Sequence, residues 1–439
     1  MSDTTHGLYS DPNDTPPMSE AVPLGLQHVL AMFASNVTPS IIVAGAAGLA
    51  FGGAEQVYLI QMAMLFAGIA TLFQTIGFGP VGARLPIMQG TSFAFVGVLA
   101  GIAATQGLSV ALTACLIGGV IHFLLGSVIQ HLRFLFPPLV TGLVILAIGL
   151  YLIPVAIKYA AGGAAPFQME AESFGSLMHW AVALSVVIVA LLLKFFTKGI
   201  ISNAAILIGL IVGYILAIIF GMVNFGAVAN AAFFVTPQPL PYGFEFSLGA
   251  VIAVTLVSIV SAIETVGDAS ATTKAGAGRE ATDKEIAGAT YADGLGTAVA
   301  AVFGGLPNTS FSQNVGIIGM TGIMSRHVVT IGALVLIICG LIPKIGAVIA
   351  SMPLPVLGGG VIVMFGMVAA AGLNVLSEVK MNRRNMVIIA VSLAAGLGLN
   401  LVPTAVQYLP GVVKTLMTSA VAPTAAVAII LNLVLPHED

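Results

Sequence analysis

Charged residues are scarce in this chain of 439 residues. Lysine, arginine, aspartate and glutamate together make up 7% of it, against about 25% in an ordinary soluble domain. Apolar residues make up 58%, more than a soluble core of this length can bury. The shortage of charge therefore excludes a soluble globular protein and indicates an integral membrane protein. The net charge of -3 also argues against a nucleic-acid partner, because such partners require basic surfaces.

Cysteine and N-terminal basic residues are also in short supply. Cys115 and Cys339 both lie in apolar stretches, so two buried thiols are expected, with a disulfide as the alternative. The first twenty residues contain four acids and no lysine or arginine, whereas a cleavable signal peptide opens with a basic region. Residues 1–22 are therefore expected to form a short, mobile cytosolic tail.

Long apolar runs dominate the rest of the chain. A helix needs roughly 20 mostly apolar residues to cross a bilayer, and twelve runs approach that length. They lie near residues 24–50, 57–76, 108–130, 137–156, 179–196, 200–221, 247–268, 288–304, 327–342, 354–373, 385–402 and 414–435. Two shorter runs, 88–103 and 311–322, are richer in glycine and polar residues. We interpret these two as discontinuous membrane segments, which gives fourteen segments.

The basic residues fall mostly on one side of this predicted arrangement. With the N-terminus inside, 11 of the 14 lysines and arginines lie in cytoplasmic loops and 3 in outer loops. Cytoplasmic loops of membrane proteins carry such an excess. Twelve or thirteen segments would scramble the asymmetry, so it favours fourteen segments with both termini in the cytoplasm.

The two halves of the chain resemble each other. The run Pro138–Gly142, followed by Gly149, recurs as Pro355–Gly359, followed by Gly366. In both copies glycine stands four and eleven residues after the proline. Seven segments per half is an odd number, so the second half must be inverted relative to the first. Inverted repeats with interrupted segments are typical of secondary transporters, and the interruptions point to the binding site.

Three carboxylates fall within predicted membrane segments, namely Glu264, Asp268 and Asp293. A charge at the bilayer centre costs about 2.5–3.5 kcal/mol on insertion scales, so each should face a cavity or a partner. Glu264 and Asp268 are one helical turn apart on one face. Such a pair in a poorly solvated site is expected to titrate jointly, as a proton-coupled carrier requires. Asp293 lies near a predicted helix start, where an acid also favours the helix dipole. A structural role remains the alternative for all three, and for His28 in the first segment.

The amide of Gln313 is a second candidate for binding. An amide offers a donor side and an acceptor side, which matches the adjacent N–H and C=O groups of an oxopurine or oxopyrimidine. A carboxylate such as Glu264 accepts two N–H bonds in parallel. The two groups would hold a flat heterocycle at opposite edges, with Phe93 and Phe95 stacked on its face. The alternative for Gln313 is a hydrogen bond between helices.

The stretch from Gln313 to Gly322 resembles the signature of the nucleobase–ascorbate transporter family, also called nucleobase:cation symporter family 2. That signature is glutamine, glutamate or proline, then asparagine, any residue, glycine, any four residues, threonine, and arginine, lysine or glycine. Gln313, Asn314, Gly316, Thr321 and Gly322 fill every specified position. Further matches are Gln27-His28, Gln89-Gly90-Thr91-Ser92-Phe93, Glu264-Thr265-Val266-Gly267-Asp268, Ala292-Asp293-Gly294 and the Pro-Leu-Pro run at Pro353.

The resemblance implies an all-α polytopic membrane protein with fourteen transmembrane segments in two inverted seven-span repeats. In the family, segments 3 and 10 contain short antiparallel strands, and the base lies between them. Family members have a core domain and a gate domain and commonly dimerise through the gate domains. On this pattern the cytosolic tail is 1–22, the core domain is 23–132 and 245–342, and the gate domain is 133–222 and 350–435.

The resemblance also implies roles for single residues in substrate binding. Glu264 would bind the base through its carboxylate, and Gln313 would hold it from the tenth segment. Main-chain groups near Phe95 and Ser312 would add hydrogen bonds. The small Ala94, between two phenylalanines, would leave room for the extra oxygen of urate.

The proton-coupling roles follow from the same resemblance. Asp268 and His28 match positions tied to proton coupling, and Asp293 matches an acidic position important for activity. The remaining motif and supporting positions are Gln89, Thr91, Asn314, Gly316 and Thr321. Protons are the expected coupling ion, with no metal or other cofactor.

The expected substrate is a purine base. Relatives that carry uracil tend to have glutamate in place of Gln313 and histidine in place of Asp268. Gln313 together with Gly322 resembles the bacterial xanthine and uric acid permease branch. The resemblance therefore implies a proton symporter of xanthine or uric acid in the bacterial inner membrane. Uracil or another nucleobase is the main alternative.

Two other functional classes fit the sequence less well. An anion transporter of the same inverted-repeat plan would want a basic pocket, yet no lysine or arginine lies in the interior of a predicted span, and Glu264 would repel an anion. A membrane-embedded enzyme would need a catalytic motif, and the chain has no His-Glu-x-x-His run and no nucleophile elbow.

Overall fold

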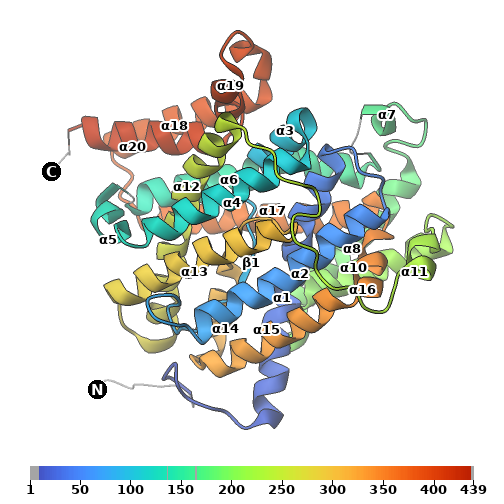
Figure 1. The fold of residues 1–439 in the computed structure, drawn as a ribbon, viewed down its shortest axis with the longest axis horizontal. Coiled ribbons are helices and arrows are strands. Elements are labelled where there is room, and N and C mark those ends of the chain that lie inside the picture. Colours follow the sequence, from blue (N-terminus) through green and yellow to red (C-terminus); the bar gives the residue numbers. More distant parts are fainter. Residues whose placement is uncertain (1–8, 136, 164–165, 437–439) are drawn as a thin grey trace.

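Helices make up almost the whole fold (Figure 1). The computed structural model describes residues 9–135, 137–163 and 166–436. Helices of the first half are α1 (Met18–Ala46), α2 (Ala54–Thr75), α3 (Val96–Gln106), α4 (Leu108–Leu125), α5 (Ile129–Leu132), the 3₁₀ helix η1 (Arg133–Leu135), α6 (Pro138–Ala160), α7 (Pro166–Met169), α8 (Leu177–Phe196), α9 (Gly199–Asn203), α10 (Ala205–Ile219) and α11 (Gly226–Asn230). Helices of the second half are α12 (Leu248–Ala277), α13 (Asp283–Val302), α14 (Ser312–Thr321), α15 (Arg326–Leu341), α16 (Pro343–Ala350), α17 (Leu354–Ser377), α18 (Arg383–Leu401), the 3₁₀ helix η2 (Pro403–Val406), α19 (Gly411–Met417) and α20 (Val421–Val434).

The outer surface of these helices is apolar, as lipid requires. Among the described residues, 8 helices are long and apolar enough to cross a membrane, or up to 9 if the bent pair α15 and α16 forms one span. The most hydropathic stretch of α8 is only 28% buried. Its exposed side chains Leu184, Ile188 and Leu192 form one stripe along the helix. The protein is therefore a helical polytopic membrane protein.

Two predicted spans are broken in the structure, and a sharp bend follows a third. The run 200–221 forms α9 and α10, and the run 414–435 forms α19 and α20, with Ala420 at a positive φ of 61° between them. The run 327–342 forms α15, and the chain then bends by 79° into α16. Pro343 opens α16, where its missing N–H and fixed φ suit the first turn of a helix but not its interior. Hydropathy alone does not report such breaks.

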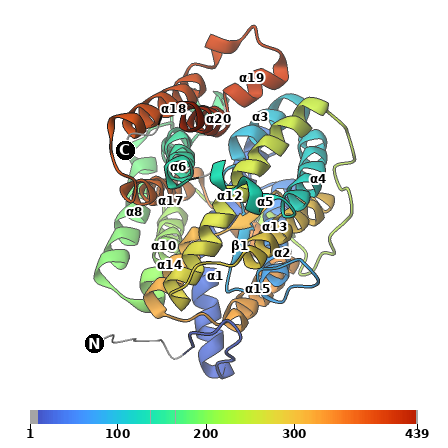
Figure 2. The ribbon, with the colours of Figure 1, turned by 90° about the vertical axis from the view of Figure 1, so that its left-hand side faces the viewer.

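Helices from the two halves pack on each other in matching pairs. Helix α2 packs on α15, and α4 packs on α13. Helix α1 also packs on α15, as α12 packs on α4. The pairs α8–α10 and α18–α20 are each formed within one half, and α6 lies along α17. Figure 2 shows α6, α8, α10, α17, α18 and α20 on one side, beside a group that includes α1, α2, α4, α12 and α13.

Two three-residue strands interrupt the helices near the middle of the molecule. Strand β1 (Gln89–Thr91) pairs antiparallel with β2 (Asn308–Ser310), with Gly90 opposite Thr309. The main chain of Ser92 extends the pairing by donating to the carbonyl of Pro307 at 2.8 Å. The chain then enters α3 after β1 and α14 after β2. Both interrupted segments therefore meet at one place, with their following helices starting there.

The contact between α6 and α17 depends on one of the repeated glycines. A Cβ at Gly149 would lie 2.3 Å from the main-chain nitrogen of Ala369, whereas a Cβ at Gly366 would meet nothing within 4 Å. We expect Gly149→Ala to destabilise the protein by about 1–3 kcal/mol, the usual cost of overpacking. Gly366→Ala should be neutral or stabilising by up to about 1 kcal/mol, because alanine favours a helix. Thermal unfolding of the purified variants measures both, and equal melting temperatures would contradict this account of the contact.

The prediction of a mobile N-terminal tail is wrong for the described residues before α1, which begin at Tyr9. The main-chain N–H of Met324 donates to the carbonyl of Tyr9 at 2.8 Å. The N–H of Arg326 donates to the carbonyl of Pro12 at 3.0 Å. These hydrogen bonds fasten the segment before α1 to the loop between α14 and α15. Residues 1–8 lie outside the described residues.

The two cysteines lie on different helices. Cys115, on α4, is buried, and Cys339, on α15, is half-buried. Both are free thiols, so the expectation of thiols rather than a disulfide is confirmed.

Candidate functional site

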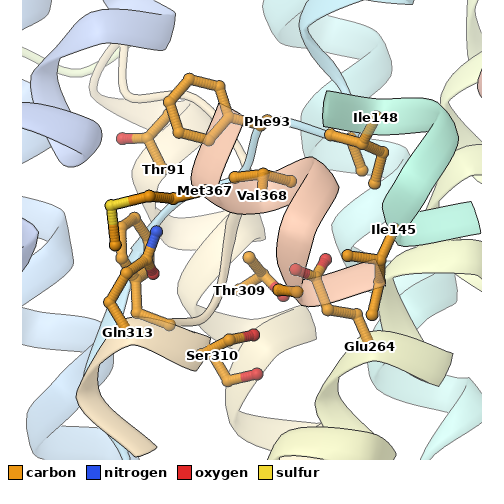
Figure 3. Close-up of a pocket in the computed structure, with 14 residues that line it drawn as sticks. Thr91, Phe93, Ile145, Ile148, Glu264, Thr309, Ser310, Gln313, Met367 and Val368 are labelled. Atoms are coloured by element: carbon orange, nitrogen blue, oxygen red, sulfur yellow. The ribbon is translucent and has the colours of Figure 1, made fainter. Parts of the chain in front are cut away.

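A cavity of about 160 Å³ lies where the two strands end. Three parts of the chain line it: the strand ends with the residues that follow them, the middle of α12, and the facing sides of α6 and α17. The lining residues are Thr91, Phe93, Ala94, Ile145, Ile148, Glu264, Thr309, Ser310, Phe311, Ser312, Gln313, Met367, Val368 and Ala371 (Figure 3). The cavity is thus polar where the strands and α12 meet and apolar along α6 and α17.

Glu264 and Gln313 lie on opposite sides of this cavity (Figure 3). Both side chains are half-buried, and neither makes a hydrogen bond or ion pair with another residue in the described part of the chain. A half-buried carboxylate and amide without partners are costly unless a ligand or water satisfies them. The predicted convergence of these two groups on one pocket is therefore what the structure shows.

Asp268 lies one turn beyond Glu264 on α12 and is buried. Its Oδ2 accepts a hydrogen bond from the Ser310 hydroxyl at 2.6 Å, and its Oδ1 accepts one from the Ser312 hydroxyl at 2.7 Å. Ser310 ends β2 and Ser312 starts α14, directly before Gln313. Asp268 therefore joins α12 to the segment that carries the second binding candidate.

Asp293 lies in the middle of α13, so the prediction that it lies near a helix start is wrong. Helix α13 begins at Asp283, where Thr282 and Glu285 form a capping box, a signal that comes before the apolar run. The side chain of Asp293 is fully buried and does not line the cavity. Its Oδ1 accepts from the side-chain amides of Gln74 at 3.0 Å and Gln89 at 2.6 Å, and its Oδ2 accepts from the Thr265 hydroxyl.

The Asp293 hydrogen bonds tie four elements together. Gln74 belongs to α2, Gln89 to β1 and Thr265 to α12, next to Glu264. A buried carboxylate that accepts from three donors holds its neighbours in place. The geometry thus gives Asp293 a positioning role behind Glu264 and β1, without contact with the cavity.

His28 and Asn314 form a separate buried pair. The Asn314 side-chain amide lies 3.0 Å from His28 Nδ1 and donates to the His28 carbonyl at 3.0 Å. Neither residue lines the cavity. This contact joins α1 to α14 one residue beyond Gln313, and the role of His28 in proton coupling stays a prediction.

The rest of the signature shapes the end of α14. The Thr321 hydroxyl accepts from the main chain of Ile323 at 3.3 Å, and Gly322 ends the helix in a left-handed conformation with φ 68°. Gly316 is exposed, with open space around it. Glycine is favoured at a left-handed helix end. The backbone conformation therefore explains the glycine at position 322 without reference to the substrate.

The two phenylalanines expected to stack on the substrate have different environments. Phe93 lines the cavity, and its ring meets that of Phe365 edge-on at 5.3 Å between centroids. Ala94 also lines the cavity. Phe95 is buried in the apolar core at the start of α3 and does not line the cavity, so its expected stacking on the base is not supported.

Two residues that support the site, Asn36 and Tyr151, are not among the predicted site residues. Asn36 on α1 accepts from the main chain of Thr91 at 2.8 Å and so holds β1. Tyr151 on α6 donates to the Phe93 carbonyl at 3.2 Å and accepts from the main chain of Gly97 at 3.1 Å. A polar amide within the apolar run 24–50 is a usable signal for Asn36, but a tyrosine in a membrane helix is not.

A second, larger cavity of about 610 Å³ adjoins the first. The two share Ile145, Glu264, Ser312 and Ala371. The larger cavity is also lined by Asp268 and by charged residues at helix ends, namely Lys274, Glu280 and Glu378. It leads from the first cavity to the side of the molecule predicted to be cytoplasmic.

Comparison with known sequences places this site in a family. A sequence profile described as the permease family matches residues 19–405. The xanthine permease XanQ of Escherichia coli (strain K12) is 34% identical over 451 residues, covering 99% of this chain and 96% of the relative. The uric acid permease PucJ of Bacillus subtilis (strain 168) is 34% identical over 419 residues, covering 95% and 92%. A Clostridium perfringens protein, provisionally named a purine permease, is 38% identical over 435 residues, covering 99% and 94%.

Solved structures share the fold at much lower identity. The transmembrane domain of the cyanobacterial bicarbonate transporter BicA has a TM-score of 0.64 at 16% identity, covering 95% of this chain and 98% of that one. The murine anion transporter Slc26a9 has a TM-score of 0.64 at 14% identity, covering 95% and 69%. At such identities the likeness concerns the fold alone. With the profile spanning most of the chain and relatives at 34–38% identity along nearly all of it, the protein belongs to the nucleobase–ascorbate transporter family, in which these similar relatives are xanthine and uric acid permeases.

Proposed function

We propose that this protein is a proton-coupled symporter that imports a purine base, xanthine or uric acid, by alternating access. The observation that carries the proposal is the unpartnered pair Glu264 and Gln313 on opposite sides of one cavity. The similar proteins are named permeases, so a membrane-embedded enzyme is no longer an alternative. A cavity of about 160 Å³ also suits one small ring system, since an engineered cavity of about 150 Å³ holds benzene.

The chemistry of the lining fits a base better than an anion. The neighbours of the same fold carry anions by their titles, which makes an anion substrate the alternative to test. No lysine or arginine is among the described residues that line the smaller cavity, and Glu264 would repel an anion. A carboxylate that accepts two N–H groups and an amide that both donates and accepts fit the edges of an oxopurine.

Proton coupling would act through Asp268. As a carboxylate it accepts from both Ser310 and Ser312. A proton on either oxygen turns that oxygen into a donor, so one serine hydroxyl must rotate or lose its partner. Because Ser312 is next to Gln313, such a change would alter the position of the amide that holds the base. Protonation and binding would then be linked through one residue of main chain.

The wider architecture would follow the family pattern. We propose fourteen segments in two inverted repeats, because several helix contacts have a counterpart with the halves exchanged, such as α2–α15 with α4–α13. The helix group of α6, α8, α10, α17, α18 and α20 would form the gate domain, and the other group the core domain. The larger cavity would make this an inward-facing state, with both termini in the cytoplasm of a bacterial inner membrane. Association into dimers through the gate domains remains a proposal.

Uptake by cells that lack their own base transporters tests the function. Cells that express the protein should accumulate labelled xanthine or uric acid, and a protonophore should remove the accumulation. Each proton gains about 2.3 kcal/mol per 100 mV, enough for roughly a fifty-fold gradient. Uptake of bicarbonate but no purine, or accumulation that ignores the protonophore, would reject the proposal.

Competition between bases measures the substrate range. Xanthine uptake should fall when unlabelled uric acid is present in excess, because Ala94 leaves space beside the base for the additional oxygen. Uracil should compete weakly, since it lacks the second ring that would reach across the cavity. Strong inhibition by uracil with none by uric acid would favour a pyrimidine carrier and remove the role assigned to Ala94.

A further inference from the structure

A third hollow, of about 1000 Å³, lies on the predicted cytoplasmic side and is separate from the transport cavities. It is formed by the loop after α2, the first turns of α13, the start of α15 and part of the segment before α1. Four cations line it, namely Arg84, Arg279, Lys284 and Arg326, against two carboxylates, Asp11 and Glu285. No step of the proposed transport cycle uses this hollow.

The carboxylates leave much of this positive charge uncompensated. Glu285 accepts from Arg279 at 2.6 and 2.9 Å and from Thr282 at 2.8 Å. Partial burial favours the neutral form of Glu285, yet the hydrogen bonds from Arg279 and Thr282 outweigh it and lower its pKa. Glu285 is thus charged and already occupied by one arginine. The side chains of Arg84 and Lys284 make no hydrogen bond or ion pair with any described residue.

Arg326 is also incompletely satisfied. Its Nη1 donates to the carbonyl of Thr75 at 2.8 Å, at the end of α2. Its Nε is enclosed and has no partner among the described residues. A guanidinium that is held at one end and has an enclosed N–H without a partner can donate a bidentate pair of hydrogen bonds to an anion, which is the geometry that arginine offers to phosphate.

The loop after α2 is built from residues with left-handed backbones. Gly77, Gly79 and Gly82 have φ of 68°, 54° and 95°, and Arg84 has φ of 55°. The spacing is that of a dinucleotide-binding fingerprint, but the loop follows a helix and leads to β1, so that interpretation does not apply. The main-chain N–H groups of Gly82 and Arg84 already donate to the carbonyls of Gly288 and Gln74 at 2.9 and 2.8 Å, so the loop contributes its shape and the Arg84 side chain rather than free N–H groups. Arg84 holds a conformation that is strained for a side-chain residue, and such strain gathers at functional sites.

We propose that this hollow binds a phosphate group. The source is either a soluble phosphorylated compound of the cytoplasm, such as a nucleotide, or the headgroup of an anionic phospholipid. Arg84, Lys284 and the free N–H of Arg326 bind the phosphate oxygens, and the small residues of the glycine loop leave room for the ligand beside these side chains. The site lies beside α2 and α13, which also carry Gln74 and Asp293. Occupancy of the site would therefore alter the hydrogen bonds that hold β1.

Titration of the purified, full-length protein tests the proposal. In one arm, calorimetry follows the addition of inorganic phosphate and of guanosine monophosphate at constant ionic strength. In the other arm, nanodiscs of phosphatidylcholine with or without phosphatidylglycerol report retained lipid by native mass spectrometry. We expect saturable binding in at least one arm, which identifies the source. The double variant Arg84→Gln, Lys284→Gln should weaken it at least about tenfold, because it removes two charge-assisted contacts.

Two further variants keep the test decisive. The control Lys198→Gln, Lys380→Gln removes two exposed cations from the same predicted side and should leave affinity unchanged. Arg84→Gly removes the charge while suiting the left-handed backbone, so it should weaken binding without loss of thermal stability. The proposal is overturned if neither arm shows saturable binding, or if the control weakens binding as much as the Arg84 and Lys284 variants.

Discussion

Replacing Glu264 with glutamine is expected to abolish purine uptake. The carboxylate lines both transport cavities and has no partner among the described residues, so a base would be its hydrogen-bond partner. Hydrogen bonds to a charged group are worth about 1.5–3 kcal/mol, a factor of roughly 10 to 150 in affinity for each. Glutamine keeps the size but presents a donor where the second N–H of the base must be accepted. Initial rates of labelled xanthine uptake should fall to those of cells without the protein.

The matched control for Glu264 is Glu172, which is exposed and lines neither cavity. Glu172→Gln should retain full uptake, which separates loss of the site from a general loss of charge. Membrane abundance of each variant, measured by immunoblot, shows whether the protein is inserted. Uptake above one tenth of the unmodified rate in a fully abundant Glu264→Gln protein would show that the carboxylate does not hold the base.

Asp268→Asn is expected to disconnect transport from the proton gradient. Asparagine can accept on one side only, so one of the hydrogen bonds from Ser310 and Ser312 is lost, and no proton can bind or leave. Proteoliposomes loaded with a pH-sensitive dye report proton entry when xanthine is added outside. The variant should show no xanthine-induced proton flux, and an imposed pH gradient should no longer concentrate the base inside.

Asp283 supplies the comparison for Asp268, because it is exposed at the start of α13. Asp283→Asn should keep both proton entry and accumulation. Ser312→Ala tests the link itself, since it removes the hydroxyl between Asp268 and the segment of Gln313 and should weaken coupling while leaving Asp268 able to titrate. Proton-driven accumulation that is unchanged in Asp268→Asn would assign coupling to another group.

Hydropathy predicts where helices lie better than where they end. A bilayer demands long apolar runs, so the predicted run 354–373 corresponds to α17. Polar residues extend helices beyond such runs, as in α13, which starts five residues before the predicted run 288–304. The three-residue strands are too short for any periodicity to show, and they are expected only through the family resemblance.

For the site, the sequence identifies the polar residues that need a cavity or a partner, but packing determines which of them line the cavity. Glu264 and Gln313 are recognisable because polar groups in a membrane segment must face a cavity or a partner. Their cavity appears where expected, but Asp293 meets the same requirement by accepting hydrogen bonds from three protein donors. Phe95 and Phe93 differ only in the turn into α3, and no pattern of residue types distinguishes the one that lines the cavity.

Tyr151 has a consequence for the energetics of the transport cycle. Its hydroxyl joins α6 to main-chain atoms on both sides of the turn between β1 and α3. In the proposed alternating-access cycle, a movement of α6 away from that turn would break both hydrogen bonds. Buried hydrogen bonds contribute about 0.5–1.5 kcal/mol each. The Tyr151 hydroxyl would therefore stabilise the state in which α6 contacts the turn and lengthen the delay before the unloaded carrier reopens. Since its partners are backbone groups that every sequence has, evolution can retune that delay at position 151 alone, leaving the chemistry of recognition untouched.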